Sequence, residues 1–292
     1  MKRVALFVLT NILILGMITV IFEVFGLSLY LEGTGINFPV LIIFSAIFGF
    51  GGAFISLLSS KWVAKTFMGV RVIDPDKAVS GDAKWIVDTV HDLSRKAGLE
   101  KMPEVAVWES EEVNAFATGP GRNNSLVAVS TGLLRSMDRG SVEGVIAHEV
   151  AHIDNGDMVT MALLQGVINT FVIFLARVAA FIVGRFINED LSFIIQFVLI
   201  MAFQTVFSIL GSLVVMGFSR YREYHADADG ARLAGKDKMI SALESLKNNK
   251  ELVDKSQPAL ATMKISGGET NWMQFFASHP PLEDRIARLK AS

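Results

Sequence analysis

The sequence contains no cysteine, and only 19% of its 292 residues are charged. The absence of cysteine excludes disulfide bonds, thiolate metal ligands and a cysteine nucleophile. A bound metal ion would therefore have to be held by His, Asp or Glu side chains. The net charge is −2 and the chain has no long basic run, so the sequence does not predict a nucleic-acid partner.

Hydrophobic residues make up 51% of the chain. Its charged fraction of 19% is below that of a typical soluble domain, in which about a quarter of the residues are charged. Four apolar runs explain this composition, at 4–24, 38–58, 159–183 and 191–218. Each has the roughly 20 residues that a helix needs to cross a bilayer. They predict an integral membrane protein with about four transmembrane helices. The two later runs also fit buried helices of a soluble core, and the sequence does not establish that they span the bilayer fully.

Lysine and arginine are distributed unevenly around these runs. They precede the first run and follow the second and fourth, whereas the loop 26–37 contains neither. Because positively charged flanks stay in the cytoplasm, both hydrophobic hairpins are expected to point out of it. The predicted domains are two membrane hairpins, 1–63 and 158–218, and two cytoplasmic segments, 64–157 and 219–292.

The two polar segments predict an α+β fold. Asp138 is expected to cap a helix that ends at Gly156, and Gly98 is expected to end another. The predicted helices are 81–97, 142–153, 222–233, 238–248 and 282–290, and the predicted strands are 105–108 and 126–129.

One predicted helix carries the motif HExxH, as His148-Glu149-Val150-Ala151-His152. Residues four apart share a helix face, so both imidazoles can bind one metal ion. Glu149 lies one step round the helix, where it is suited to contact a water molecule rather than the metal. The surrounding residues are mostly apolar, which argues against histidines on an ordinary surface helix.

A catalytic zinc ion usually has three protein ligands and one open position. The best candidate for the third ligand lies in the string 219–227, after the fourth apolar run. Glu223 and Asp227 are four residues apart on a predicted helix, so both can face one site. We expect Glu223 to bind zinc and Asp227 to orient a ligand imidazole. His225 is the competing ligand, although it faces away from both carboxylates.

These motifs resemble those of the HtpX-type membrane metalloproteases. The HExxH helix leads into a hydrophobic hairpin, and the string SRYREYHADADGARLAG follows it. The strings NAFATG at 114–119 and SHPPLEDRI at 278–286 also match in order and character. The resemblance covers essentially the whole chain. This family is related to the membrane CAAX-prenyl proteases and is similar to gluzincins, with a distant Glu in an ExxxD pattern that Glu223 and Asp227 match.

The resemblance implies a stress-response, quality-control protease of the bacterial cytoplasmic membrane. We therefore expect a multi-pass zinc endopeptidase with one Zn²⁺ per chain and a zincin-like domain built from both cytoplasmic segments. Its expected partners are the lipid bilayer and, as substrates, misfolded membrane proteins or unfolded polypeptides. The HExxH helix lies a few residues from the third apolar run, so the active site is expected near the cytoplasmic membrane surface.

The two remaining motifs have less specific interpretations. An edge strand is expected to pair with the substrate through Asn114, Ala115 and Phe116. The alternative is an ordinary strand with Phe116 in the core. His279 is expected to donate a hydrogen bond to the developing oxyanion, or else to hold a nearby carbonyl. Arg285 either braces the loop around His279 or pairs with Asp227.

Three other classes of protein fit the sequence less well. A scaffold or zinc-sensing protein without catalysis would not need Glu149. A zinc transporter would need His or acidic residues within the apolar runs, and Glu23 is the only one there. A CAAX-type peptidase would need an enclosed membrane chamber, which the small number of apolar runs does not favour.

Overall fold

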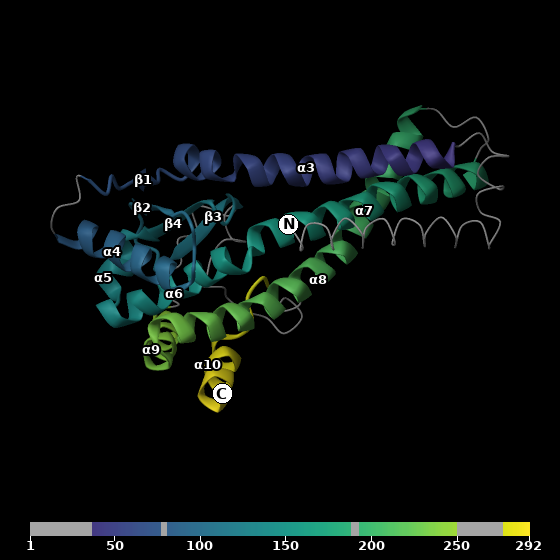
Figure 1. Ribbon diagram of the computed structural model, residues 1–292. Coiled ribbons are helices and arrows are strands. Elements are labelled where there is room, and N and C mark those ends of the chain that lie inside the picture. The colour runs from purple at the N-terminus through teal and green to yellow at the C-terminus, as the bar shows by residue number, and fades with distance from the viewer. Residues whose placement is uncertain (1–36, 77–80, 188–192, 250–276) are drawn as a thin grey trace. The chain divides into compact units, whose positions relative to one another are not determined.

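The computed structural model describes residues 37–76, 81–187, 193–249 and 277–292, so the apolar run at 4–24 lies outside the described residues. These residues form two compact units. The first contains the described residues up to Ile55 and Ala162–Ser212, and the second contains Ser56–Met161 and Leu213–Ser292. The described residues are mostly helical with one small sheet, which agrees with the predicted α+β class (Figure 1).

Parts of three long helices form the described residues of the first unit. They are α3 (Phe38–Phe67), α7 (Asp157–Ile187) and α8 (Phe193–Ala234), and all three are long and apolar enough to cross a membrane. In this unit α3 packs closely on α7 at Gly49. A Cβ atom at this position would lie only 2.4 Å from Oγ1 of Thr170. Small residues allow such close approach between membrane helices. Three of the predicted apolar runs therefore lie in helices of spanning length.

The second unit contains a four-stranded sheet with the strand order β1-β2-β4-β3. Its strands are β1 (Arg71–Val72), β2 (Glu104–Trp108), β3 (Ala115–Gly121) and β4 (Asn124–Ser130). β2 and β4 are parallel, and the other two pairs are antiparallel. Alternate residues face opposite sides: Val105 and Val127 join the main core, whereas Ala106 and Ala128 join a smaller cluster with Phe116. Both predicted strands are confirmed, and β3 lies at an edge of the sheet.

Helices cover one face of this sheet and form the main core with it. They are α4 (Gly81–Lys96), α5 (Thr131–Ser136), α6 (Arg139–Asn155), α9 (Lys236–Asn248) and α10 (Leu282–Ala291). α6 contacts β3, β4 and α4, α9 packs on α6, and α10 packs on α9 (Figure 1). α6 is therefore surrounded by other elements, and its central residues are buried.

The ends of α6 follow from two residues. Asp138 accepts hydrogen bonds from the backbone N–H groups of Gly140 and Ser141, as an N-cap does. Gly156 has φ 65° and ψ 32°, a left-handed conformation that favours glycine, and α7 begins at the next residue. Both predicted helix ends are confirmed. The predicted helix 222–233 is not separate, because no Gly or Pro interrupts the chain between Phe218 and Arg222, and α8 continues through it.

Candidate metal centre

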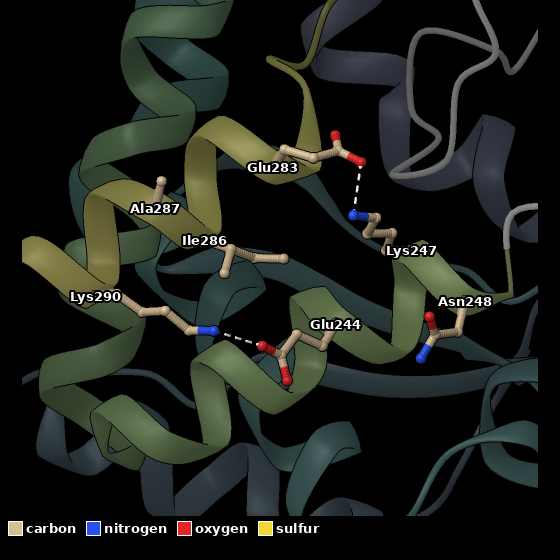
Figure 2. A pocket seen from close by; sticks show the side chains of 7 residues that line it. All are labelled: Glu244, Lys247, Asn248, Glu283, Ile286, Ala287 and Lys290. Atoms are coloured by element: carbon tan, nitrogen blue, oxygen red, sulfur yellow. Dashed lines mark hydrogen bonds and ion pairs between the residues drawn. The ribbon is translucent and has the colours of Figure 1, made fainter.

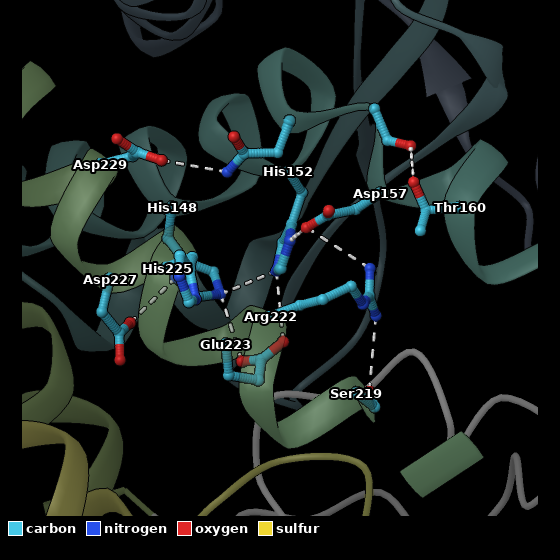
Figure 3. Close-up of polar contacts among 12 residues, drawn as sticks. His148, His152, Asp157, Thr160, Ser219, Arg222, Glu223, His225, Asp227 and Asp229 are labelled. Atoms are coloured by element: carbon cyan, nitrogen blue, oxygen red, sulfur yellow. Dashed lines mark hydrogen bonds and ion pairs between the residues drawn. The ribbon is translucent and has the colours of Figure 1, made fainter. Parts of the chain in front are cut away.

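The two histidines of the HExxH motif lie one turn apart on α6 and face Glu223 of α8 (Figure 3). Their Nε2 atoms are 3.1 Å apart. One carboxylate oxygen of Glu223 lies 3.4 Å from Nε2 of His148, and the other lies 3.2 Å from Nε2 of His152. One ligand atom from each of the three residues lies within 4.8 Å of the others, an arrangement that can hold a metal ion.

An aspartate holds each imidazole through its other nitrogen. Nδ1 of His148 lies 3.0 Å from Oδ1 of Asp227. Nδ1 of His152 lies 2.7 Å from Oδ2 of Asp157. A ring that donates its Nδ1 proton to a carboxylate presents a lone pair at Nε2. Two such lone pairs and the Glu223 carboxylate therefore meet at one point, and this donor set fits a divalent metal ion.

Protons compete with a metal ion for these nitrogens. Burial alone would lower the pKa of His152, but Asp157 and Glu223 outweigh it and raise that pKa to about 10. Burial likewise opposes a raised pKa of His148, yet Asp227 and Glu223 raise it. In the absence of a metal ion the ring of His152 is therefore protonated at neutral pH, and metal binding must displace its proton.

A buried ion pair supports the imidazole of His148. Arg285 is only 1% exposed, and its Nε and Nη2 atoms lie 2.8 and 2.5 Å from the two carboxylate oxygens of Asp227. Burial acts in the opposite direction, but Arg285 lowers the pKa of Asp227 to about 2. Nη2 of Arg285 is 3.4 Å from Nδ1 of His148, farther than Asp227 is, so the ring donates to the carboxylate. Of the two alternatives for Arg285, the structure shows the pairing with Asp227.

Glu149 lies beside the cluster but does not belong to it. Its side chain is almost completely buried, with 5% exposure. Burial raises the pKa of Glu149, although the nearby imidazoles of His148 and His152 act to lower it. A carboxyl group with a raised pKa exchanges protons near neutral pH more readily, which suits a general base.

Asp157 and Arg222 also lie at the cluster, and motif spacing does not reveal them. Asp157 follows Gly156, whose left-handed conformation turns the chain so that the carboxylate reaches back to His152. Nη1 of Arg222 lies 3.4 Å from the same carboxylate oxygen. The available signal in the sequence is a Gly-Asp pair directly after the HExxH helix.

His279 contacts the cluster, whereas His225, the other histidine that the sequence singles out, does not. Nδ1 of His279 lies 2.7 Å from Oε2 of Glu223, so His279 contacts a candidate ligand. His225 is exposed, and its Nδ1 lies 3.0 Å from the backbone oxygen of Tyr221, away from the cluster. His225, the alternative third ligand, is therefore not among the residues that converge.

The residues of the NAFATG string lie in and next to the edge strand β3. The side chains of Asn114, Ala115 and Phe116 are all buried. Phe116 packs against Trp108, with 5.2 Å between ring centroids. β3 is thus an edge strand and Phe116 is a core residue, whereas the pairing of this strand with a substrate stays a prediction.

A surface pocket elsewhere in this unit lies between α9 and α10 (Figure 2). Ion pairs between Lys247 and Glu283 and between Lys290 and Glu244 border it. Its charged side chains are thus paired with each other, and it shares no residue with the His–Glu cluster. The candidate chemistry therefore lies at the cluster.

Comparisons with known proteins agree with this geometry. Residues 80–292 match the model of peptidase family M48. The chain is 55% identical to the "Protease HtpX homolog" of Bacillus licheniformis, and the alignment covers 99% of both chains. It is 48% identical to the "Protease HtpX" of Hydrogenovibrio crunogenus over 100% of this chain and 97% of that one. The crystal structure of S. mikatae Ste24p matches with a TM-score of 0.62 and 17% identity, over 93% of this chain and 64% of that chain.

Proposed function

This chain belongs to peptidase family M48 as an HtpX-type membrane metalloprotease, and from this premise we propose that it is a zinc endopeptidase that cleaves cytoplasmic regions of membrane proteins. The observation that best supports the proposal is the convergence of His148, His152 and Glu223 beside the buried Glu149. One Zn²⁺ per chain would bind to the first three residues.

Glu149 is the proposed general base and acid. A zinc ion held by the cluster would polarise a water molecule and the carbonyl group of the scissile bond. Glu149 accepts a proton from the attacking water and later delivers it to the leaving amine. Its raised pKa supports this role, because the carboxyl group must hold the proton between the two steps.

His279 is the proposed donor to the oxyanion that develops on the attacked carbonyl group. Its Nδ1 atom faces Glu223, so this role requires Nε2 to point toward the substrate. Asp227 and Arg285 are proposed to orient His148, because their ion pair is buried and Asp227 lies 3.0 Å from the ring. Preorganised donors and ligands of this kind stabilise a transition state without further rearrangement.

The edge strand β3 is the proposed site of substrate binding. The side chains of Ala115 and Phe116 are buried, so pairing would use the main chain, with Asn114 at the start of the strand. Main-chain pairing depends little on substrate sequence. β3 also contacts α6, which carries the HExxH motif. Extended stretches of misfolded membrane proteins or unfolded polypeptides are therefore the proposed substrates, in a role in membrane quality control under stress.

The proposed location is the bacterial cytoplasmic membrane, with the active site on the cytoplasmic side. Lysines and arginines flank the apolar runs on the side of the polar segments, which supports this orientation. Gly156 alone separates α6 from α7, so the cluster lies a few residues from an apolar helix. We propose that segments 64–157 and 219–292 together form the protease domain.

The test pairs zinc content with cleavage of casein, for the wild type and Glu149→Gln. Both proteins are purified in detergent in the presence of a chelator and then given zinc. Zinc bound by both proteins, with cleavage by the wild type alone, is the expected result. Cleavage by Glu149→Gln at the wild-type rate would overturn the role of Glu149. Zinc bound by neither protein would overturn the metal centre.

A further inference from the structure

We propose that Asp157, held by Arg222, is a positioning residue for His152 and connects this imidazole to the polar ends of the two apolar helices α7 and α8. The inference rests on the proposed metal centre and extends it. The observation that carries it is a series of His–Asp–Arg contacts that occurs at both imidazoles of the HExxH motif.

Each imidazole contacts an aspartate (Figure 3), and each aspartate contacts an arginine. The two series of contacts are His148–Asp227–Arg285 and His152–Asp157–Arg222. The first combines residues of α6, α8 and α10, and the second combines residues of α6, α7 and α8. The repetition indicates that Asp157 orients the imidazole of His152 as Asp227 orients that of His148.

In the second series, one carboxylate oxygen of Asp157 contacts both the imidazole and the guanidinium group. Oδ2 of Asp157 lies 2.7 Å from Nδ1 of His152 and 3.4 Å from Nη1 of Arg222. The side chains of Asp157 and Arg222 are only 10% and 15% exposed, so water competes little for these contacts. Nη2 of Arg222 also lies 3.4 Å from Oγ of Ser219, one turn earlier in α8. The guanidinium group therefore restrains the carboxylate, and the carboxylate fixes the tautomer and orientation of the ring.

The position of both residues in the chain connects the metal site to the apolar helices. Asp157 is the first residue of α7, and Arg222 lies in α8 four residues after the apolar run that ends at Phe218. A shift of one helix end against the other would separate the guanidinium from the carboxylate. The hold on His152, and with it the retention of the metal ion, therefore depends on how these two helix ends pack.

The first experiment measures how fast zinc leaves the full-length protein in detergent when a colorimetric chelator is added in excess. Asp157→Ala is expected to release zinc about 10–100 times faster than the wild type, the usual effect of losing a residue that orients a ligand. The matched control is Asp154→Ala, near the end of α6, because Asp154 pairs with Arg122 and not with the cluster. The control is expected to stay within about twofold of the wild type.

Two further variants distinguish positioning from a general structural role. Asp157→Asn keeps an acceptor oxygen for the ring, so its release rate should lie between those of the wild type and Asp157→Ala. Arg222→Gln should change the release rate when Asp157 is present and should not change it in the Asp157→Ala background. The absorption spectrum of the Co²⁺-loaded protein should also change in Asp157→Ala and not in Asp154→Ala.

The outcomes separate this inference from the proposed function. Release from Asp157→Ala and Asp157→Asn within twofold of the wild type would overturn the positioning role, while zinc binding by the wild type would leave the metal centre intact. Additive effects of Arg222→Gln and Asp157→Ala would overturn the connection through Arg222. A wild-type protein that binds no zinc would instead contradict the metal centre itself.

Discussion

Oδ1 of Asp227 lies 3.0 Å from Nδ1 of His148, although the two are 79 positions apart in sequence with two apolar runs between them. α6 supplies the imidazole and α8 supplies the carboxylate. The same face of α8 also supplies Glu223, so one helix brings both a candidate ligand and the group that orients another ligand. The geometry of the cluster therefore depends on how α8 packs against α6.

Arg285→Ala is predicted to destabilise the protein. The substitution would remove the guanidinium partner of the buried carboxylate of Asp227, and breaking a buried ion pair in this way typically costs about 3–5 kcal/mol of unfolding free energy. Denaturant titration in detergent, followed by circular dichroism, measures this change. Arg232→Ala is the control, because Arg232 is 60% exposed where it pairs with Asp229. Equal losses in the two variants would contradict the account of the buried pair.

The affinity for zinc is predicted to rise with pH. Asp157 and Glu223, acting against burial, raise the pKa of His152 to about 10. The protonated ring therefore stabilises the metal-free fold fully below its unfolded pKa of about 6.5, and this contribution is lost as the pH rises towards 10. Zinc competes with the same proton, so its affinity should increase about tenfold per pH unit for each proton released. Calorimetry in buffers of different ionisation enthalpy measures the protons released, and no release would contradict the prediction.

Asp138→Ala is predicted to destabilise the protein by about 1 kcal/mol, because Asp138 caps the first turn of α6. The thermal midpoint in detergent should fall accordingly. Asp88→Ala serves as the comparison, since Asp88 is an exposed residue within α4 that pairs with Lys84. A midpoint for Asp138→Ala at or above that of Asp88→Ala would argue against the cap.

His279→Ala is predicted to lower kcat about 10²–10³-fold if His279 donates to the oxyanion. KM should change little, because the donor acts mainly in the transition state. Zinc content should be retained, since His279 is not among the three converging residues. His91→Ala, on α4, is the control. A loss of zinc from His279→Ala would instead indicate that its contact with Glu223 holds the ligand.

Local patterns in the sequence predict the parts of this structure that depend on neighbours in the chain. The i, i+4 spacings of the HExxH motif and of Glu223 and Asp227 give the helix faces that meet in the cluster. Cap chemistry gives the ends of α6 at Asp138 and Gly156. The length of the apolar runs gives helices of spanning length, although the run at 4–24 lies outside the described residues.

Contacts that depend on the path of the chain in three dimensions are not predictable in this way. Asp157 reaches His152 only because Gly156 adopts a left-handed conformation between two helices. The choice of Asp227 as the partner of Arg285 depends on how α10 approaches α8 through their buried side chains. The family resemblance of the SHPPLEDRI string singles out His279 but does not show that its Nδ1 faces a ligand carboxylate.

The most direct test of the metal centre compares zinc content and casein cleavage in Glu223→Gln and His225→Ala. The two residues are two positions apart on α8, but only Glu223 faces the two Nε2 atoms. The account predicts one zinc ion per chain and cleavage in His225→Ala, and loss of both in Glu223→Gln. Full zinc content and wild-type cleavage in Glu223→Gln would contradict it.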